Sequence, residues 1–343
     1  MKVATAPVEQ LEHSSSGMLR LFSGLEGLVE VERLVKARSR SESSTLQAIP
    51  FYLLELGGKR VRPLLAILSA KIFGMQLPDM RLIEIAAGIE MIHMATLLHD
   101  DIIDGAVTRR HRDAPLVRFG QNATILAGDF LFVRAFGLCA KLDRFIIEST
   151  ERACVDLTEG EMLEMEPGTV RNLERCLEVS RKKTASLFAL GALCGSHIAG
   201  APIESVERMR ECGELLGIAF QIVDDMLDVT SSQDILGKPS GADLRELKPS
   251  VVNALWLRKG SALSKELFSG QIRDPLRFEA ALKKAKVEIT ESAVLDDARS
   301  FVASYVARAR ATLREAISHA PVVDRKAVGM IEELIAFAVE RAS

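Results

Sequence analysis

The sequence predicts an all-α protein built as one large helical bundle. Apolar residues recur at helical spacing along nearly the whole chain of 343 residues. No stretch sustains the two-residue alternation, rich in Val, Ile and aromatic residues, that is typical of strands. Hydrophobic residues make up 48% of the chain, which is enough for a large core. Since no internal repeat of fixed period is present, a single bundle is favoured over a solenoid.

The ends of the helices follow from glycines, prolines and polar capping residues. Two segments are expected to be loops: Gly105–Gly120, which is rich in Arg, and Val229–Pro249, which is rich in Ser, Gly and Pro. Residues 1–40 are expected to form an N-terminal helical arm, and residues 41–343 the helical domain. The predicted helices are Ser44–Leu56, Val61–Phe73, Asp79 to about Asp104, Ala123–Lys141, Arg144–Met165, Asn172–Ala199, Ser205–Asp228 and several after Pro249.

Charge and cysteine content exclude several classes of protein. The net charge is −3, and no block of Lys and Arg is interleaved with aromatic residues, so no nucleic-acid partner is expected. The segment Met1–Ser16 has no apolar run, and no window approaches about 18 uninterrupted apolar residues, so neither a secretory signal nor a membrane span is expected. The five cysteines lie far apart without a CxxC pair, which indicates reduced residues of a cytoplasmic protein: Cys139, Cys154, Cys176, Cys194 and Cys212.

Two clusters of aspartates share one spacing. In each, carboxylates stand at positions i, i+1 and i+4, and the second cluster lies about 120 residues after the first. At about 100° per residue, the first and last carboxylates of a cluster sit about 40° apart on one helix face. The clusters are Asp100, Asp101 and Asp104, and Asp224, Asp225 and Asp228.

A single cluster of this kind would more often be a solvated helix end. Both clusters here end strongly apolar helices, where carboxylates repel one another and are costly to bury unless a cation neutralises them. Mg²⁺ takes hard oxygen ligands and is typically held by a few carboxylates together with substrate phosphates. The pattern therefore predicts Mg²⁺ and a diphosphate substrate.

Basic residues accompany both acidic clusters. The turn Gly57-Gly58-Lys59-Arg60-Val61-Arg62 combines basic side chains with the N–H groups of a helix start, which suits an anion. One such group is often a solvated surface, but several around two acidic clusters favour a diphosphate site. The other members are Arg109, Arg110, Lys183 with Thr184, Lys238 and Lys248.

Three further polar residues fall near the acidic clusters. His93 lies seven residues before Asp100 and points within about 20° of it, although a lone His on an apolar face is usually a core residue. His99 is read as structural or supporting. Gln221 stands one turn before Asp224 and is either a donor to the anion or a buried, hydrogen-bonded amide.

These residues together resemble the trans-polyprenyl diphosphate synthase family, most closely its octaprenyl type. The resemblance runs from Gly57 to the C-terminal helices and implies an isoprenoid-synthase bundle and a homodimer. The matching motifs are Gly57 to Pro63, Glu90 to His93, Asp100 to Asp104, Arg109-Arg110, Gly128 to Leu131, Gly160-Glu161, Lys183-Thr184, Phe220 to Asp228, and Gly237 to Lys248.

The resemblance also implies roles for the individual residues. The six aspartates, with Lys183 and Lys238, would carry catalysis, and Mg²⁺ would bridge the allylic diphosphate to Asp100, Asp104 and Asp224. The diphosphate of isopentenyl diphosphate would be bound by Lys59, Arg62, His93 and Arg110. The allylic diphosphate would be bound by Arg109, Lys183, Thr184, Gln221, Lys238 and Lys248.

The chain departs from the family pattern at three positions. His111 stands where Gly is usual, Glu164 where Gln is usual, and Ser250 where Thr is common. These departures concern the fine geometry of the site and not the class of reaction.

The implied reaction is ionisation of the allylic diphosphate, condensation and loss of a proton. Thr96, one turn before Asp100, and Ala95 are both small, whereas a bulky aromatic at the latter position stops growth early in the family. A long product for quinone side chains is therefore expected, made from farnesyl or geranylgeranyl diphosphate, and the product would allow peripheral contact with a membrane.

Other interpretations remain open. They are a geranylgeranyl or heptaprenyl synthase, and a non-catalytic subunit of a heteromeric synthase, which would tend to lose the aspartates. A terpene cyclase is disfavoured because its second metal site is usually an Asn/Asp, Ser/Thr and Glu triad. A purely structural helical protein is disfavoured because it has no reason to collect acids and bases on apolar helices.

Overall fold

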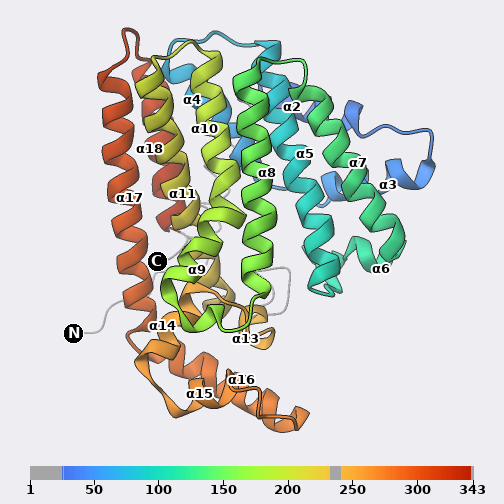
Figure 1. The fold of residues 1–343 in the computed structure, drawn as a ribbon, viewed down its shortest axis with the longest axis vertical. Coiled ribbons are helices and arrows are strands. Elements are labelled where there is room, and N and C mark those ends of the chain that lie inside the picture. The colour runs from blue at the N-terminus through green and yellow to red at the C-terminus, as the bar shows by residue number, and fades with distance from the viewer. Residues whose placement is uncertain (1–24, 26, 232–240, 341–343) are drawn as a thin grey trace.

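The computed structural model describes residue 25 and residues 27–231 and 241–340, the side chains of residues 338–340 excepted. Long helices run roughly along one direction and form the body of the molecule (Figure 1). They are α2 (Leu28–Arg38), α3 (Ser44–Glu55), α4 (Val61–Ile72), α5 (Met80–Ile103), α7 (Gln121–Cys139), α8 (Arg144–Met165), α10 (Ser186–Ile198), α11 (Ile203–Thr230), α17 (Val294–Ser318) and α18 (Arg325–Glu340).

The remaining elements connect these helices or lie at one end of the bundle (Figure 1). A π-helical segment, η2, joins α9 to α10, and a 3₁₀ turn, η1, precedes α9. The remaining elements are β1 (Thr108–Arg109), β2 (Arg112–Asp113), α6 (Pro115–Phe119), η1 (Thr169–Arg171), α9 (Leu173–Val179), η2 (Ser180–Ala185), α13 (Ala242–Arg245), α14 (Val251–Lys259), α15 (Ala262–Leu267) and α16 (Pro275–Glu291).

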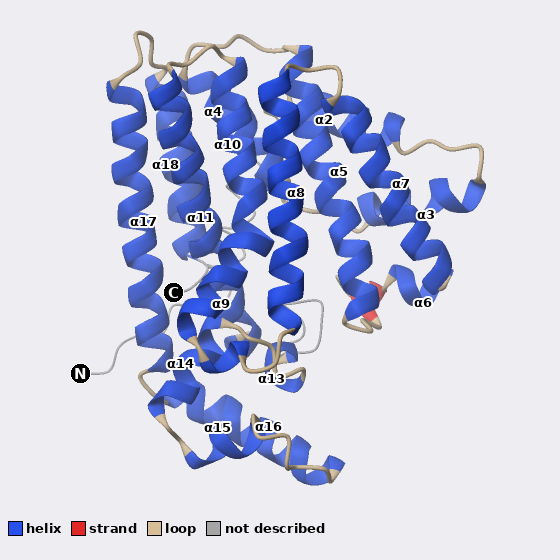
Figure 2. Ribbon diagram, viewed as in Figure 1, coloured by secondary structure: helices blue, strands red, loops and turns tan. Residues whose placement is uncertain are grey.

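The all-α prediction is confirmed, and several helix ends follow from caps visible in the sequence. Asp79 accepts a hydrogen bond from the Arg81 amide at 2.9 Å and begins α5, and Asp143 accepts one from the Ile146 amide at 3.0 Å and begins α8. Within the described residues, strand structure is limited to one antiparallel hairpin of two residues on each side (Figure 2).

Three predicted segments differ in detail. The helix expected over Asn172–Ala199 is divided, because η2 inserts a π-helical turn between α9 and α10. The segment expected as a loop over Gly105–Gly120 contains the hairpin and α6, and α13 lies inside the segment Val229–Pro249. Neither hairpin nor π-turn has a strong periodic signal, since each involves only a few residues.

Two neighbouring apolar clusters form the core. One surrounds α5, whose residues pack against α2, α4, α7 and α10, and the other surrounds α11, which packs against α10, α17 and α18. Helix α2 belongs to the first cluster through Leu28, Val31 and Val35. The division of the chain at residue 40 stays a prediction.

Two helices are long and apolar enough to cross a membrane by length and composition alone. In α5, 72% of the apolar window is buried inside the bundle, as expected of a core helix, whereas the corresponding share in α7 is 39%. All five cysteines carry free thiols, as predicted.

Candidate active site

A cavity of about 650 Å³ lies among α4, α5, η2 and α11 and gathers most of the predicted residues. The loop before α4 lines one side of it, η2 and α11 line the other, and α5 and the hairpin contribute residues to both sides. A smaller cavity of about 290 Å³ shares Asp100 and Lys183 with the first. Across both cavities the predicted residues are Lys59, Arg62, His93, Thr96, Asp100, Asp104, Arg109, Arg110, Lys183, Thr184, Gln221, Asp224, Asp225 and Lys248.

The remaining predicted positions lie elsewhere. Lys238 is outside the described residues. Ala95 is fully buried in the cluster around α5 and does not line the cavity, whereas Thr96 does and donates its hydroxyl to the His93 carbonyl at 2.8 Å. His99 points to α7, where its Nε2 lies 3.2 Å from the Ile125 carbonyl, which agrees with a structural role.

The six aspartates divide into two kinds. Asp100, Asp104 and Asp224 line the cavities and are half-buried. The other three are at most 3% exposed and have partners inside the protein, although Asp225 also borders the smaller cavity. Asp101 accepts from Arg109 Nη2 at 2.6 Å, Asp225 from the Val251 amide at 2.8 Å, and Asp228 from the Asp243 amide at 3.1 Å. The three half-buried aspartates are the ones predicted to hold the metal.

The carboxyl group of Asp100 lies in surroundings that favour a bound cation. Burial raises its pKa to about 7, Lys183 opposes that rise, and the nearby Glu161 and Asp104 carboxylates add to it. Among the described side chains, no three Asp, Glu, His or Cys residues converge into a complete metal cage. An ion held here would take further ligands from substrate and water, as Mg²⁺ commonly does.

On the side of the cavity next to η2, each described cation is paired with a carboxylate. Lys183 Nζ lies 2.6 Å from Glu161 Oε2 and also contacts Glu164. Lys248 Nζ lies 2.7 Å from Asp104 Oδ2, and Arg109 holds Asp101 through two nitrogens. Burial lowers the pKa of Lys183, but the surrounding carboxylates, Asp100 foremost, outweigh it and raise the pKa above its usual value.

A hydrogen-bonded chain crosses from η2 to α11. Thr184 Oγ1 donates to Gln221 Oε1 at 2.6 Å, and Gln221 Nε2 donates to Asp225 Oδ1 at 2.8 Å. The amide of Gln221 is thus held by protein partners, which matches its interpretation as a hydrogen-bonded amide.

On the opposite side, Arg62 and His93 form a pair without a carboxylate. Arg62 Nη1 lies 3.1 Å from His93 Nε2, and because a guanidinium only donates, Nε2 is the acceptor and the ring proton resides on Nδ1. Burial first, and then Arg62, Arg109 and Arg110, lower the pKa of His93 well below its usual value, so the ring is neutral at pH 7. Among the described residues, the buried Arg62 Nε has no hydrogen-bond partner.

Two other basic residues complete this side. Arg110 Nη1 donates to the Gly57 and Leu56 carbonyls, and Lys59 Nζ lies 4.8 Å from the centre of the Phe337 ring on α18. Arg110 is thus held by main-chain carbonyls, and Lys59 contacts an aromatic ring. Arg60 binds the nearly buried Glu90 at 2.8 Å and Glu32 of α2 at 3.1 Å, which fixes the loop.

Some contributors were not assigned a role from sequence. Glu161 was quoted only as part of a motif, and Phe188, which lies under the Arg62 guanidinium at 4.9 Å, and Phe337 were not named. The i, i+3 spacing of Glu161 and Glu164 on α8 was a usable signal, since it puts both on one helix face. Phe337 had none, because its approach depends on how α18 packs.

Each departure from the family pattern has a local structural consequence. His111 has a φ of 64°, a backbone region where glycine is the unstrained residue. Glu164 adds a carboxylate at Lys183. Ser250 accepts a hydrogen bond from the Asn253 amide at 3.1 Å and caps α14, which a Thr side chain also does well.

Comparison with known proteins gives a consistent result. Residues 43–288 match the family described as polyprenyl synthetase. The chain is 35% identical over 291 residues to nonaprenyl diphosphate synthase of Mycobacterium tuberculosis, covering 83% of this chain and 85% of that one. It is 33% identical over 310 residues to geranylgeranyl diphosphate synthase of Methanosarcina mazei, covering 87% and 89%.

The fold has equally similar solved structures. A polyprenyl synthase from Caulobacter crescentus, solved with calcium and isoprenyl diphosphate, superposes with a TM-score of 0.85 at 30% identity, covering 100% of both chains. The relatives make products of different length, so the comparison leaves the product length of this chain open.

Proposed function

Since the chain belongs to the polyprenyl synthetase family, whose prenyltransferases condense isopentenyl diphosphate, we propose that it makes a long-chain all-trans product such as octaprenyl diphosphate. It would extend farnesyl or geranylgeranyl diphosphate, and the product would supply quinone side chains. The observation that carries the proposal is the small side chain of Thr96 in the cavity wall below Asp100, which leaves room for a growing chain.

The two sides of the cavity suit the two substrates. Arg62, with Lys59, Arg110 and neutral His93, binds the diphosphate of isopentenyl diphosphate. Lys183 and Lys248 bind the allylic diphosphate beside the cavity-lining aspartates. Lys238, a predicted member of this group, lies outside the described residues.

The proposed reaction depends on stabilising the negative charge that develops on the departing diphosphate. The allylic C–O bond breaks with its electron pair on the departing diphosphate, and the surrounding cations stabilise that charge. The double bond of isopentenyl diphosphate attacks the allylic cation, and the departing diphosphate takes the proton whose loss restores an allylic product. Asp100, Asp104 and Asp224 would hold the divalent metal used by the family, which we assign as Mg²⁺, and the metal would further stabilise the leaving charge.

Chain length gives the first prediction. Replacing Thr96 by Phe fills the cavity wall and is expected to shift the product to a shorter chain, measured by separating the dephosphorylated products by length. Ala95→Tyr is expected to do the same, although its Cβ is fully buried and the ring must push into the cavity. Val287→Phe, at an exposed position of α16, is a matched control. An unchanged product with Thr96→Phe would contradict the proposed path of the chain.

We also propose a homodimer built on α7. Leu126 and Val133 on α7 are 58% and 70% exposed, and only 39% of the apolar window of this helix is buried in one chain. A second copy covering this face would remove apolar surface from water. Light scattering should give twice the chain mass, and Val133→Glu should shift the measured mass towards that of a single chain.

We also propose a cytoplasmic location, with peripheral membrane contact through the product.

One incubation separates the proposal from its alternatives. The purified protein is mixed with farnesyl diphosphate, labelled isopentenyl diphosphate and Mg²⁺, and the products are sized. A single product well beyond geranylgeraniol is expected. A short product would favour a geranylgeranyl or heptaprenyl synthase, and absence of incorporation without a partner would favour the non-catalytic subunit.

A further inference from the structure

The segment that carries Lys183 and Thr184 is π-helical. In η2 the chain fits one extra residue into the helix, a local insertion that is rare and often found at functional sites. Lys183 and Thr184 line the cavity, whereas their neighbours Arg181 and Lys182 are absent from its wall. The segment therefore has an inner pair of side chains and an outer pair.

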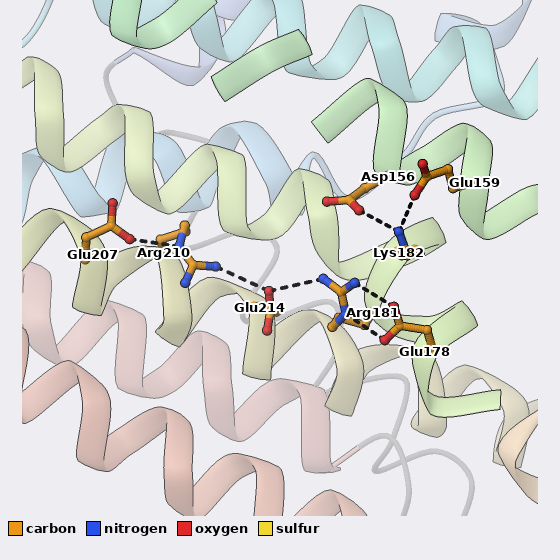
Figure 3. A network of polar contacts seen from close by, with 8 residues as sticks. All are labelled: Asp156, Glu159, Glu178, Arg181, Lys182, Glu207, Arg210 and Glu214. Carbon is orange, nitrogen blue, oxygen red and sulfur yellow. Dashed lines mark hydrogen bonds and ion pairs between the residues drawn. The ribbon is translucent and has the colours of Figure 1, made fainter. Parts of the chain in front are cut away.

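The outer pair is tied to the two flanking helices. Lys182 Nζ lies 3.0 Å from Asp156 Oδ1 and also contacts Glu159, both on α8 (Figure 3). The Lys182 side chain is only 16% exposed, so this contact is better shielded from solvent than an ordinary surface ion pair.

A second, longer set of contacts reaches α11. Arg181 holds Glu178 at 2.7 Å and lies 3.9 Å from Glu214, which Arg210 contacts at 3.3 Å (Figure 3). Because Arg210 and Glu214 are both on α11, the row of charges links η2 to that helix from outside the cavity.

Two glycines bring the same flanking helices close to η2. A Cβ on Gly160 of α8 would lie 2.6 Å from the Lys183 amide nitrogen, and a Cβ on Gly217 of α11 would lie 2.5 Å from Ala185 Cα. Neither neighbour can yield cheaply, because both are backbone atoms. The π-turn is thus held between two helices that pack against its backbone, with ion pairs on its outer surface.

We propose that Lys182 is a positioning residue: through Asp156 and Glu159 it fixes η2 so that Lys183 and Thr184 meet the allylic diphosphate. The inference rests on the proposed function. Lys182 touches no substrate; its loss removes no cavity-lining side chain but lets η2 relax away from the site. Arg62 and His93, which line the isopentenyl diphosphate side, lie on α4 and α5, whereas both ion pairs of Lys182 are with α8.

The test compares the two substrates in Lys182→Met, which keeps the length of the side chain and removes its charge. We expect the KM for the allylic diphosphate to rise about fivefold to tenfold, with the KM for isopentenyl diphosphate unchanged. Lys182→Arg, which restores both ion pairs, should return the allylic KM to the parent value. Arg144→Met, which removes an exposed ion pair with Glu148 on the same helix α8, is the matched control.

A second variant disturbs η2 by steric contact. Gly160→Ala places a methyl group against the η2 backbone and should raise the same KM selectively. If Gly160→Ala does not fold, the double variant Asp156→Asn with Glu159→Gln tests the proposal instead, because it removes the same two ion pairs of Lys182 from the α8 side. Amide hydrogen exchange over residues 180–185 should become faster in Lys182→Met.

The outcomes are separable from those for the proposed function. If the unaltered protein joins the two substrates but Lys182→Met leaves both KM values unchanged, or raises both equally, the positioning role is wrong. If the unaltered protein does not join them at all, the proposed function fails first.

Discussion

The two sides of the cavity hold their cations in different ways. Beside α4, Arg62 and Arg110 contact a neutral histidine and main-chain carbonyls, and the nearby Glu90 is bound by Arg60. Beside η2, Lys183 and Lys248 are each held by carboxylates. A diphosphate arriving on the first side replaces weak neutral contacts, but one arriving on the second must displace or neutralise carboxylates.

This difference indicates where the metal matters. Carboxylates facing a diphosphate repel it unless a divalent cation neutralises them, so we expect the η2 side to need metal to bind its substrate. We expect the Arg62 side to bind without metal. We therefore propose metal-independent binding of isopentenyl diphosphate and metal-dependent binding of the allylic substrate.

The largest expected effect is a loss of kcat when a carboxylate of the proposed metal site is removed. Asp100→Asn removes a cavity-lining carboxylate while keeping its size, and kcat should fall about 10³-fold because the charge on the leaving group loses its stabilisation. Steady-state kinetics at saturating Mg²⁺ measures it. Asp296→Asn, on the exposed surface of α17, should match the parent. Near-normal kcat in Asp100→Asn would remove Asp100 from the metal site.

An intermediate effect is expected for the substrate bound on the Arg62 side of the cavity, and not for the one bound on the η2 side. Arg62→Met removes charged hydrogen bonds worth about 1.5–3 kcal/mol, so the KM for isopentenyl diphosphate should rise roughly 10- to 100-fold. The allylic KM should stay close to the parent value. Arg81→Met, which removes a side chain that is 61% exposed at the start of α5, is the control. An equal rise in both KM values would show that the sides are not independent.

The smallest expected effect concerns the Glu164 carboxylate next to Lys183. Glu164→Gln removes the carboxylate that competes with the substrate for Lys183, so the allylic KM should fall about threefold. Glu148→Gln is the control. Glu148 is half-exposed and lies near the other end of α8, so the allylic KM should stay unchanged. A rise in the allylic KM would instead make Glu164 a useful ligand of the site.

The sequence predicted the helical bundle and most of the cavity wall because both depend on regular spacing. Asp100 and Asp104 were placed on one face by helix geometry alone, and α8 was delimited correctly by the cap at Asp143. Pairing across the cavity was not predictable: the contact of Lys248 with Asp104 joins residues 144 positions apart. The division of the aspartates into half-buried and fully buried members also needed the packing of α14, since the Val251 amide binds Asp225.

The most direct test of the account is equilibrium binding of each substrate with and without metal. Isopentenyl diphosphate and a farnesyl thiodiphosphate that ionises slowly are titrated separately into the protein in EDTA and in Mg²⁺. We expect the affinity for isopentenyl diphosphate to be unchanged and that for the farnesyl analogue to be about tenfold or more weaker in EDTA. An equal loss of both affinities in EDTA would contradict the assignment of the metal to one side of the cavity.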